Sequence, residues 1–214
     1  FKIPLPPLEE QKRIAAILDK ADSIRRKRKD AIALTEELLR STLLDMFGDP
    51  VTNPKGWEIV PMKSVVLETQ YRTSAKSNTD KNGLPILRMN NITYTGKIDL
   101  DDIKWCNISA ADEEKYTVKR GDLLFNRTNS PELLGKTGVW RSDKKYALAG
   151  YLVRVRFKKD RALSEYVSAY LNSSYGKKYL YEKAKPSNNM SNFSASEFVK
   201  IPLLLPPLQL QKKV

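Results

Sequence analysis

A long helical pattern begins at Leu5-Pro6-Pro7-Leu8-Glu9-Glu10-Gln11-Lys12-Arg13-Ile14. The fixed φ of proline suits a helix entrance, and the two glutamates put negative charge in the first turn, where the helix dipole favours it. No glycine or proline follows until Gly48-Asp49-Pro50, and apolar residues recur at intervals of three and four up to Phe47. This pattern predicts one helix of about 37 residues, roughly 55 Å long, whose apolar stripe needs a partner to cover it.

The motif that opens this helix occurs twice in the chain. Residues 205–214, Leu-Pro-Pro-Leu-Gln-Leu-Gln-Lys-Lys-Val, follow the order of residues 5–14 at a shift of 200 positions. Lys200-Ile201-Pro202 precedes the second copy as Lys2-Ile3-Pro4 precedes the first. We therefore expect the chain to span one unit of a repeat, with residues 200–214 as the start of a second helix of the same kind.

Residues 48–199 differ in character, with short apolar runs, turn residues and aromatic residues. The pattern predicts strands around 59–61, 86–92, 122–126, 138–141 and 148–157, helices at about 164–172 and 175–184, and a polar loop at 185–194. The expected fold class is α+β: a mixed α/β domain at 48–199 that follows a long, coiled-coil-forming helix at 1–47.

The chain is strongly basic, with 38 Lys and Arg against 25 Asp and Glu and a net charge of +13. The excess is uneven, because residues 48–116 carry a net charge of −1 and residues 117–199 carry +9. A basic surface of this kind favours a polyanionic partner, either nucleic acid or a membrane surface. No stretch is long and apolar enough to span a membrane.

Histidine is absent, which excludes Ser-His-Asp and Cys-His catalysis and histidine metal sites. The single cysteine, Cys106, has no partner for an internal disulfide, and its position beside Trp105 indicates a small buried residue. A lone reduced thiol suits the cytoplasm. These observations favour a binding module with no catalytic or metal site of its own.

Two other functions remain open from the residues alone. A metal-dependent nuclease needs carboxylates and a lysine that converge on a phosphate, and the chain has these residue types at Asp101, Asp102, Glu113 and Lys115. Metal-dependent cleavage by the chain alone, abolished by Glu113→Ala, would support that function. A helical scaffold protein that binds acidic proteins is the other alternative, and salt-sensitive binding to duplex DNA would argue against it. Neither explains the repeat at the two ends.

Several motifs together resemble the specificity subunit of type I restriction-modification enzymes, and the resemblance covers nearly the whole chain. At the helix, they are Ile3-Pro4-Leu5-Pro6-Pro7-Leu8-Glu9-Glu10-Gln11-Lys12-Arg13-Ile14 ahead of it, then Phe47-Gly48-Asp49-Pro50 and Asn53-Pro54-Lys55-Gly56-Trp57-Glu58 after it. Inside the domain, they are Leu87-Arg88-Met89-Asn90-Asn91-Ile92, the segment Gly121 to Thr137, and Ala149-Gly150-Tyr151-Leu152-Val153-Arg154.

The resemblance implies a subunit with two target-recognition domains, each followed by a long helix, and with the two helices packed antiparallel as a spacer. This chain has one domain and one full helix, so it corresponds to about half of such a subunit. The implied role is non-catalytic: DNA binding that directs methyltransferase and motor-endonuclease subunits in prokaryotic defence. No cofactor is expected on this chain, because S-adenosylmethionine, ATP and Mg belong to the partner subunits. A second specificity half, or a homodimer, is expected to join through the long helix.

Candidate DNA contacts fall into two groups. The expected phosphate contacts are Arg127, Lys136, Lys177, Lys178 and Lys185. Arginine can pair with guanine and asparagine with adenine in the major groove, so the candidate readers of base edges are Arg72, Lys76, Arg88, Asn90, Asn129, Asn188, Asn189 and Asn192. Specificity is expected mainly in 69–83 and 185–193, whereas 121–137 supports the fold or holds phosphate. Five phosphate contacts predict that log affinity falls against log salt with a slope of about −4.5.

Overall fold

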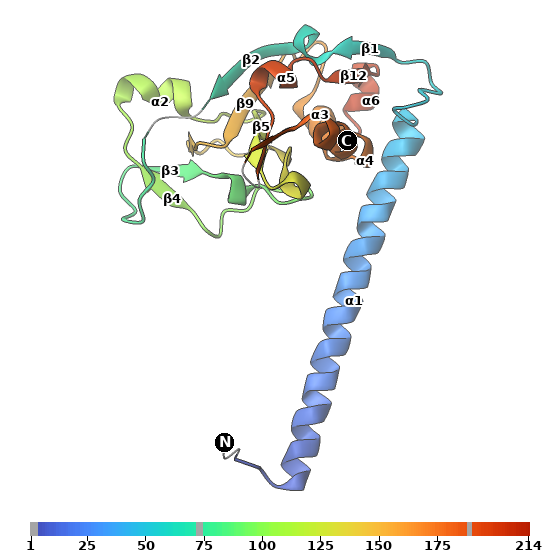
Figure 1. The fold of residues 1–214 in the computed structure, drawn as a ribbon, viewed down its shortest axis with the longest axis vertical. Coiled ribbons are helices and arrows are strands. Elements are labelled where there is room, and N and C mark those ends of the chain that lie inside the picture. Colours follow the sequence, from blue (N-terminus) through green and yellow to red (C-terminus); the bar gives the residue numbers. More distant parts are fainter. Residues whose placement is uncertain (1–3, 72–74, 188–189) are drawn as a thin grey trace. The chain divides into compact units, whose positions relative to one another are not determined.

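The computed structural model describes residues 4–71, 75–187 and 190–214, and the chain divides into two compact units, Phe1–Gly48 and Asp49–Val214. The first unit is a single helix, α1 (Leu8–Phe47), of 40 residues, which is about 60 Å at the α-helical rise (Figure 1). It ends at Gly48, whose φ of 79° lets its N–H donate to the carbonyl of Leu44 across 2.7 Å. The prediction of one uninterrupted helix is confirmed.

Apolar side chains are exposed along the whole length of α1. Ile17, Leu34 and Leu38 are 57%, 66% and 65% exposed. A soluble helix does not normally leave so long an apolar stripe in water. The stripe is consistent with a helical partner, and the coiled coil stays a prediction.

The second unit is built around a four-stranded antiparallel sheet with the strand order β2-β9-β5-β7. Its strands are β2 (Val66–Tyr71), β9 (Leu152–Phe157), β5 (Leu123–Asn126) and β7 (Thr137–Val139). A three-stranded sheet in the order β4-β3-β8 lies beside it in the chain's second unit, with β4 (Lys104–Cys106), β3 (Leu84–Leu87) and β8 (Ala147–Leu148). Two smaller sheets complete the strand structure: β1 (Glu58–Pro61) pairs with β12 (Pro202–Leu205), and β10 (Lys185–Ser187), β11 (Met190–Asn192) and β6 (Thr128–Asn129) form the other.

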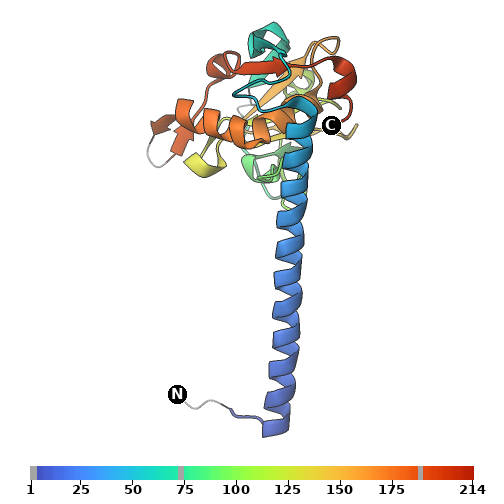
Figure 2. The same cartoon turned by 90° about the vertical axis from the view of Figure 1, so that its right-hand side faces the viewer.

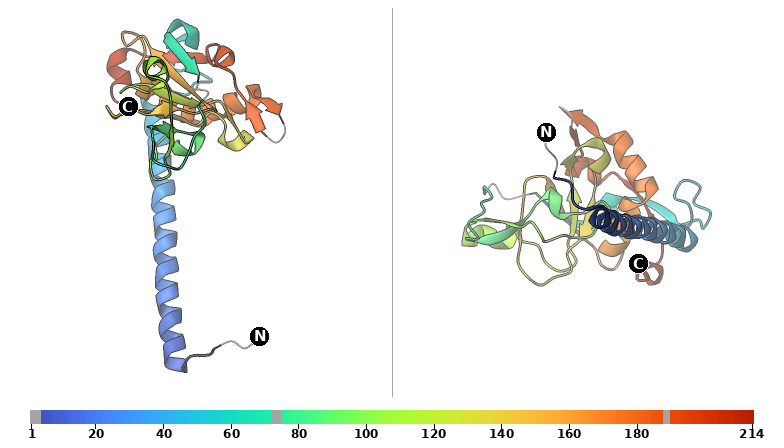
Figure 3. Two further views of the ribbon diagram at one scale, coloured as in Figure 1. Left: turned by 90° about the vertical axis from the view of Figure 1, so that its left-hand side faces the viewer. Right: turned by 90° about the horizontal axis from the view of Figure 1, so that it is seen from below.

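Short helices connect and cover these sheets. They are α2 (Ala110–Tyr116), α3 (Ser164–Asn172), α4 (Ser174–Lys183), α5 (Ala195–Phe198) and α6 (Leu208–Gln211), together with the 3-10 turns η1 (Met62–Ser64), η2 (Met89–Asn91) and η3 (Pro131–Leu133). After α4 the chain enters the β10–β11 hairpin, which projects from the unit (Figure 2; Figure 3, left). No helix in the described part of the chain has both the length and the apolar character needed to cross a bilayer.

The core holds the hairpin in place through aromatic contacts. Phe125 of β5 packs edge-on against Phe193, which follows β11, and against Phe198 of α5, with ring centroids 5.9 and 4.9 Å apart. All three rings are almost fully buried, so their burial and their geometry both stabilise the contact. The base of the hairpin is therefore attached to the central sheet.

The structure agrees with the predicted mixture of helix and strand but differs in several boundaries. The expected strand at 86–92 ends at Leu87, because the side-chain oxygen of Asn91 accepts from the backbone N–H of Arg88 across 2.8 Å and stabilises the turn η2. The expected strand at 148–157 is two strands, β8 and β9, separated by a turn. The polar loop expected at 185–194 is the β10–β11 hairpin. The strand β2 and most of α2 had no clear sequence signal.

The second unit continues to Val214. Its strand β12 pairs with β1, and the short α6 follows, so residues 200–214 make contacts within this unit. That these residues also begin a further long helix stays a prediction. Cys106 is fully buried as expected, and burial raises the pKa of its thiol.

Candidate nucleic-acid interface

A row of polar side chains crosses the sheet β10-β11-β6. The strand register places Lys185 opposite Asn192, and Asn192 opposite Thr128. Residues directly opposite each other in antiparallel strands project from the same face. The hydroxyl of Thr128 donates to Oδ1 of Asn192 across 3.2 Å, in agreement with that arrangement.

Arg127 extends this row from the residue before β6. Its Nη2 donates to Oδ1 of Asn192 across 3.2 Å, and its guanidinium carbon lies 5.4 Å from the ring centroid of Tyr71. Tyr71 is 40% exposed, and its hydroxyl accepts from the backbone N–H of Ala195 across 2.9 Å, which fixes the ring. We call Lys185, Asn192, Thr128 and Arg127 the polar row, with Tyr71 beside it.

The polar row has the chemistry of a nucleic-acid contact. Arginine and lysine bind phosphate oxygens, asparagine can bond to base edges, and an exposed aromatic ring under a guanidinium gives a surface on which a base can stack. The two cations of the row come from different segments, Lys185 from β10 of the hairpin and Arg127 from the residue before β6.

Two of the predicted phosphate contacts are held inside the unit. The ammonium of Lys136 donates to the carbonyl of Met89 across 2.9 Å, and the residue is only 7% exposed. Lys177 of α4 places its ammonium 4.6 Å from the ring centroid of Tyr94, buried and with no hydrogen-bond partner among the described residues. Burial, and then the charge of Lys136, lower the pKa of Lys177 to about 8, and burial lowers that of Lys136. Both ammonium groups are better described as buried than as surface charges.

Other predicted residues lie at the surface or have partners in the fold. Lys76, Asn90, Lys178 and Lys185 are exposed, and the Lys178 ammonium is 3.9 Å from Glu182. Arg88 forms an ion pair with Asp102 at 2.6 Å.

Asn129 is 8% exposed, and its side-chain oxygen accepts from the backbone N–H of Ser130. Arg72, Asn188 and Asn189 lie outside the described residues. Of the predicted residues that are described, the structure brings three together: Arg127, Asn192 and Lys185.

Two arginines of residues 117–199 are paired inside the fold, which the sequence did not indicate. Arg154 is 2% exposed and donates to Glu68 at 2.6 Å and to the carbonyl of Thr117. Arg156 bonds to Asp122 and Glu68. Burial raises the pKa of Glu68, but the charges and hydrogen bonds of the two arginines outweigh it and lower that pKa overall. These arginines stabilise the sheet from β2 to β9 and leave the surface less basic than the composition implies.

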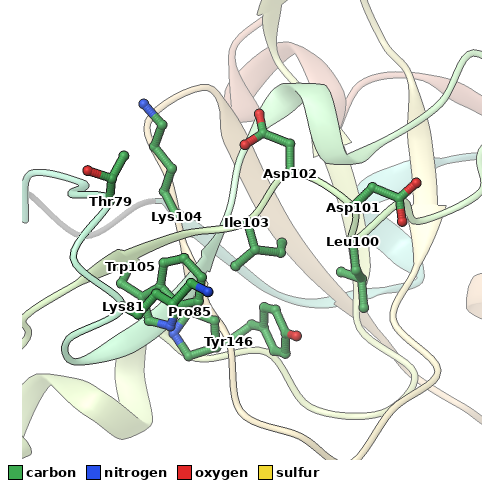
Figure 4. Close-up of a pocket in the computed structure, with 10 residues that line it drawn as sticks. All are labelled: Thr79, Lys81, Pro85, Leu100, Asp101, Asp102, Ile103, Lys104, Trp105 and Tyr146. Atoms are coloured by element: carbon green, nitrogen blue, oxygen red, sulfur yellow. The ribbon is translucent and has the colours of Figure 1, made fainter.

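The carboxylates of the nuclease alternative do not converge. Asp101 and Asp102 line a hollow of about 610 Å³ beside Trp105 and Tyr146, and their carboxyl groups point in different directions (Figure 4). Glu113 is paired with Lys145, and Lys115 lies 5.0 Å from the ring centroid of Tyr116. Among the described residues no group of three acidic, cysteine or histidine side chains is placed to hold a metal ion.

Comparison with known proteins decides the family. Residues 1–34 and 54–214 match the family described as type I restriction modification DNA specificity domain. The chain belongs to this family. The resemblance inferred from the motifs is thereby confirmed, and the matched residues include the polar row and the start of α1.

Relatives of this specificity domain match it over almost its full length. It is 26% identical over 229 residues to the type I restriction enzyme EcoKI specificity subunit of Escherichia coli K12, covering 100% of this chain and 49% of that protein. It is 28% identical to the type I restriction enzyme MjaVIII specificity subunit of Methanocaldococcus jannaschii, covering 99% of this chain and 53% of that one. The chain thus spans about half the length of these curated relatives.

A solved structure shows the same architecture. The HsdS subunit from Thermoanaerobacter tengcongensis superposes with a TM-score of 0.59 at 25% identity, covering 99% of this chain and 50% of that one. A second chain, from a structure of a type I R-M system, gives a TM-score of 0.62, also at 25% identity, with 51% of that chain covered. The combination of a long helix and one mixed α/β domain is therefore the specificity-domain fold.

Proposed function

We propose that this specificity domain reads one half of a bipartite target in double-stranded DNA. The observation that carries the proposal is the polar row, which brings a cation and an amide of the β10–β11 hairpin beside Arg127, with the exposed ring of Tyr71 next to that arginine. The family match supports DNA as the polyanion. Arg127 and Lys185 position the domain on the phosphates, and Asn192 reads a base edge.

In this proposal, the helix α1 fixes the distance between this domain and a second recognition domain on the same DNA. A rod of about 60 Å spans more than one turn of B-DNA, which is about 34 Å. The exposed apolar stripe of α1 packs against a second long helix, from another specificity half or from a second copy of this chain. Target spacing is then a consequence of helix length.

Catalysis belongs to partner proteins in this proposal. The domain acts in the cytoplasm with methyltransferase subunits and, for cleavage, with a motor-endonuclease subunit. S-adenosylmethionine, ATP and Mg are bound by those partners, and this chain contributes no catalytic residue. The names of its relatives as type I restriction enzyme specificity subunits support this assignment.

Methylation mapping tests the proposal directly. The chain is co-expressed with a type I methyltransferase subunit in cells that lack methylation, and methylated sites are mapped across the genome. We expect one bipartite motif, symmetric if two copies of the chain pair. The variant Asn192→Ala should alter the motif at one position, whereas the surface variant Lys55→Ala should leave it unchanged. Absence of any motif would contradict the proposal.

Salt dependence supplies a second test with the purified chain. If Arg127, Lys178 and Lys185 each neutralise one phosphate, the slope of log affinity against log salt is about −2.7 for duplex DNA. A slope of about −4.5 would mean that five phosphates are neutralised, the number expected if Lys136 and Lys177 also reached the DNA. A slope near zero would mean that this surface does not touch DNA.

A further inference from the structure

Tyr71 lies where the central sheet of the second unit meets the segment after the β10–β11 hairpin. It is the last residue of β2, and the strand register places it opposite Val153 of β9, which is in turn opposite Phe125 of β5. Residues in register on neighbouring strands project from the same face, so the Tyr71 ring lies on the face where Phe125 packs against Phe193. The bond from the backbone N–H of Ala195 to the Tyr71 hydroxyl agrees with this placement.

The backbone of Arg127 is fixed by more contacts than its side chain. Its N–H donates to the carbonyl of Tyr151 across 2.9 Å, and its carbonyl accepts from the N–H of Phe193 across 2.8 Å. Among the residues that the structure describes, the guanidinium makes one hydrogen bond, to Asn192, and its buried Nε makes none. A single bond leaves a planar guanidinium free to rotate about it, whereas two contacts fix its plane. The second contact is the ring of Tyr71, whose centroid is 5.4 Å from the guanidinium carbon.

The Tyr71 ring is itself held at both ends. Its backbone lies in β2, which is paired with β9, and its hydroxyl is bonded to the N–H of Ala195 across 2.9 Å. A change of rotamer would break that hydroxyl bond. The segment after the hairpin therefore fixes the ring, and the ring stands in a fixed place beside the guanidinium of Arg127.

We propose that Tyr71 is a positioning residue for DNA recognition, because its ring holds the Arg127 guanidinium beside Asn192. This inference rests on the proposed function, in which Arg127 binds phosphate and Asn192 reads a base edge. A guanidinium that is already held in one orientation loses less side-chain freedom when DNA binds, and this raises affinity. Tyr71 acts through Arg127 in this role. A ring on which a base stacks would instead act on DNA without Arg127.

A double-mutant cycle separates these two roles. Fluorescence anisotropy measures the affinity for target duplex DNA of the wild type, Tyr71→Leu, Arg127→Ala and the variant that carries both substitutions. We expect Tyr71→Leu to weaken binding by about twofold to fivefold in the wild type and to have no effect when Arg127 is already alanine. Tyr116 is the matched control, because its ring also lies beside a cation, Lys115, and Tyr116→Leu should leave affinity unchanged. Equal losses from Tyr71→Leu in both backgrounds, or no loss in the wild type, would overturn the proposal.

Proton NMR of the free chain tests the positioning without DNA. The ring current of Tyr71 shifts the side-chain resonances of Arg127, which are assigned by their loss in Arg127→Lys. We expect this shift to persist in Tyr71→Phe, which keeps the ring, and to disappear in Tyr71→Leu. Tyr71→Phe should accordingly weaken DNA binding less than Tyr71→Leu does. Arg127 resonances that are the same in the wild type and in Tyr71→Leu would show that the ring does not hold the guanidinium.

The two measurements also distinguish this inference from the proposed function. If Arg127→Ala weakens DNA binding and Tyr71→Leu does not, the proposed DNA contact stands and the role of Tyr71 is wrong. If Arg127→Ala leaves DNA binding unchanged, the proposed contact is wrong, and the role of Tyr71 in recognition fails with it even where the NMR shift is present.

Discussion

The guanidinium of Arg127 donates to the side-chain oxygen of Asn192 across 3.2 Å, although 65 positions separate the two residues in the sequence. The contact joins the start of β6 to the end of β11 and orients both side chains. It also occupies the oxygen of Asn192, which leaves the Asn192 amide nitrogen as its donor toward a base. We therefore expect the two residues to act as a unit in the proposed DNA contact.

The contact between Arg127 and Asn192 predicts non-additive effects on DNA binding. Arg127→Ala should weaken binding to all duplex sequences alike, and Asn192→Ala should relax preference at one position by about 1–3 kcal/mol. The double variant should lose less binding free energy than the two single variants lose together, because each residue orients the other. Fluorescence anisotropy with the mapped target and a scrambled duplex measures these changes.

Arg120 provides the matched control for this prediction. It is an arginine of the same unit that is paired with Asp143 through two hydrogen bonds and lies outside the polar row. Arg120→Ala should leave affinity and preference close to those of the wild type. If Arg120→Ala weakens binding as much as Arg127→Ala, the polar row is not the specific contact.

The buried ammonium of Lys177 predicts that stability rises with pH in an alkaline window. Its pKa is about 8 in the fold against an ordinary value of 10.5, so the unfolded chain binds more protons between these two pH values. Stability contributed by this residue is therefore recovered as the pH rises from about 8 to 10.5. Between pH 7.5 and 9.5, the free energy of unfolding measured in urea should rise more for the wild type than for Lys177→Met. Equal rises in the two proteins would contradict the burial of a charged amine at this position.

The pairing of Glu68 with Arg154 and Arg156 predicts a loss of stability in acid. The folded pKa of Glu68 lies below its ordinary value of 4.5, so the stabilisation is fully present above pH 4.5. It is lost as the pH falls through the folded pKa, since the protonated acid no longer pairs with the arginines. Glu68→Gln should be less stable than the wild type at pH 6, and its stability should fall less on acidification. Asp143→Asn, which removes an exposed carboxylate, is the control. At pH 6 it should be clearly more stable than Glu68→Gln.

The length of α1 predicts the spacing of the DNA target. An insertion of four residues after Lys27 lengthens the helix by about 6 Å, close to the rise of two base pairs of B-DNA. Methylation mapping of this variant should show the same two half-sites with the spacer longer by about two base pairs. Substitution of Lys27 by alanine, with no insertion, should leave the spacer as it is. An unchanged spacer in the insertion variant would show that α1 does not set the distance.

Local patterns predicted the parts of this protein whose structure depends on near neighbours. The helix at Leu8–Phe47 followed from the absence of helix breakers, and its end followed from Gly48. Strand β5 and helices α3 and α4 lay where their apolar periodicity indicated. The end of strand β3 at Leu87 was not predicted. It depends on a turn that the side chain of Asn91 closes, and apolar periodicity carries no information about such a side-chain hydrogen bond.

By itself the sequence determined the long helix, the repeated helix entrance, the α+β class and the family, because each rests on residues that are close together or in a fixed order. Only the tertiary structure decided which cations face the solvent. Lys136 and Lys185 are the same residue type in the same basic segment, yet the ammonium of Lys136 is buried against Met89, whereas Lys185 is exposed. The physical reason is that the charge a lysine presents depends on its desolvation and on its partners, and those partners come from distant parts of the chain.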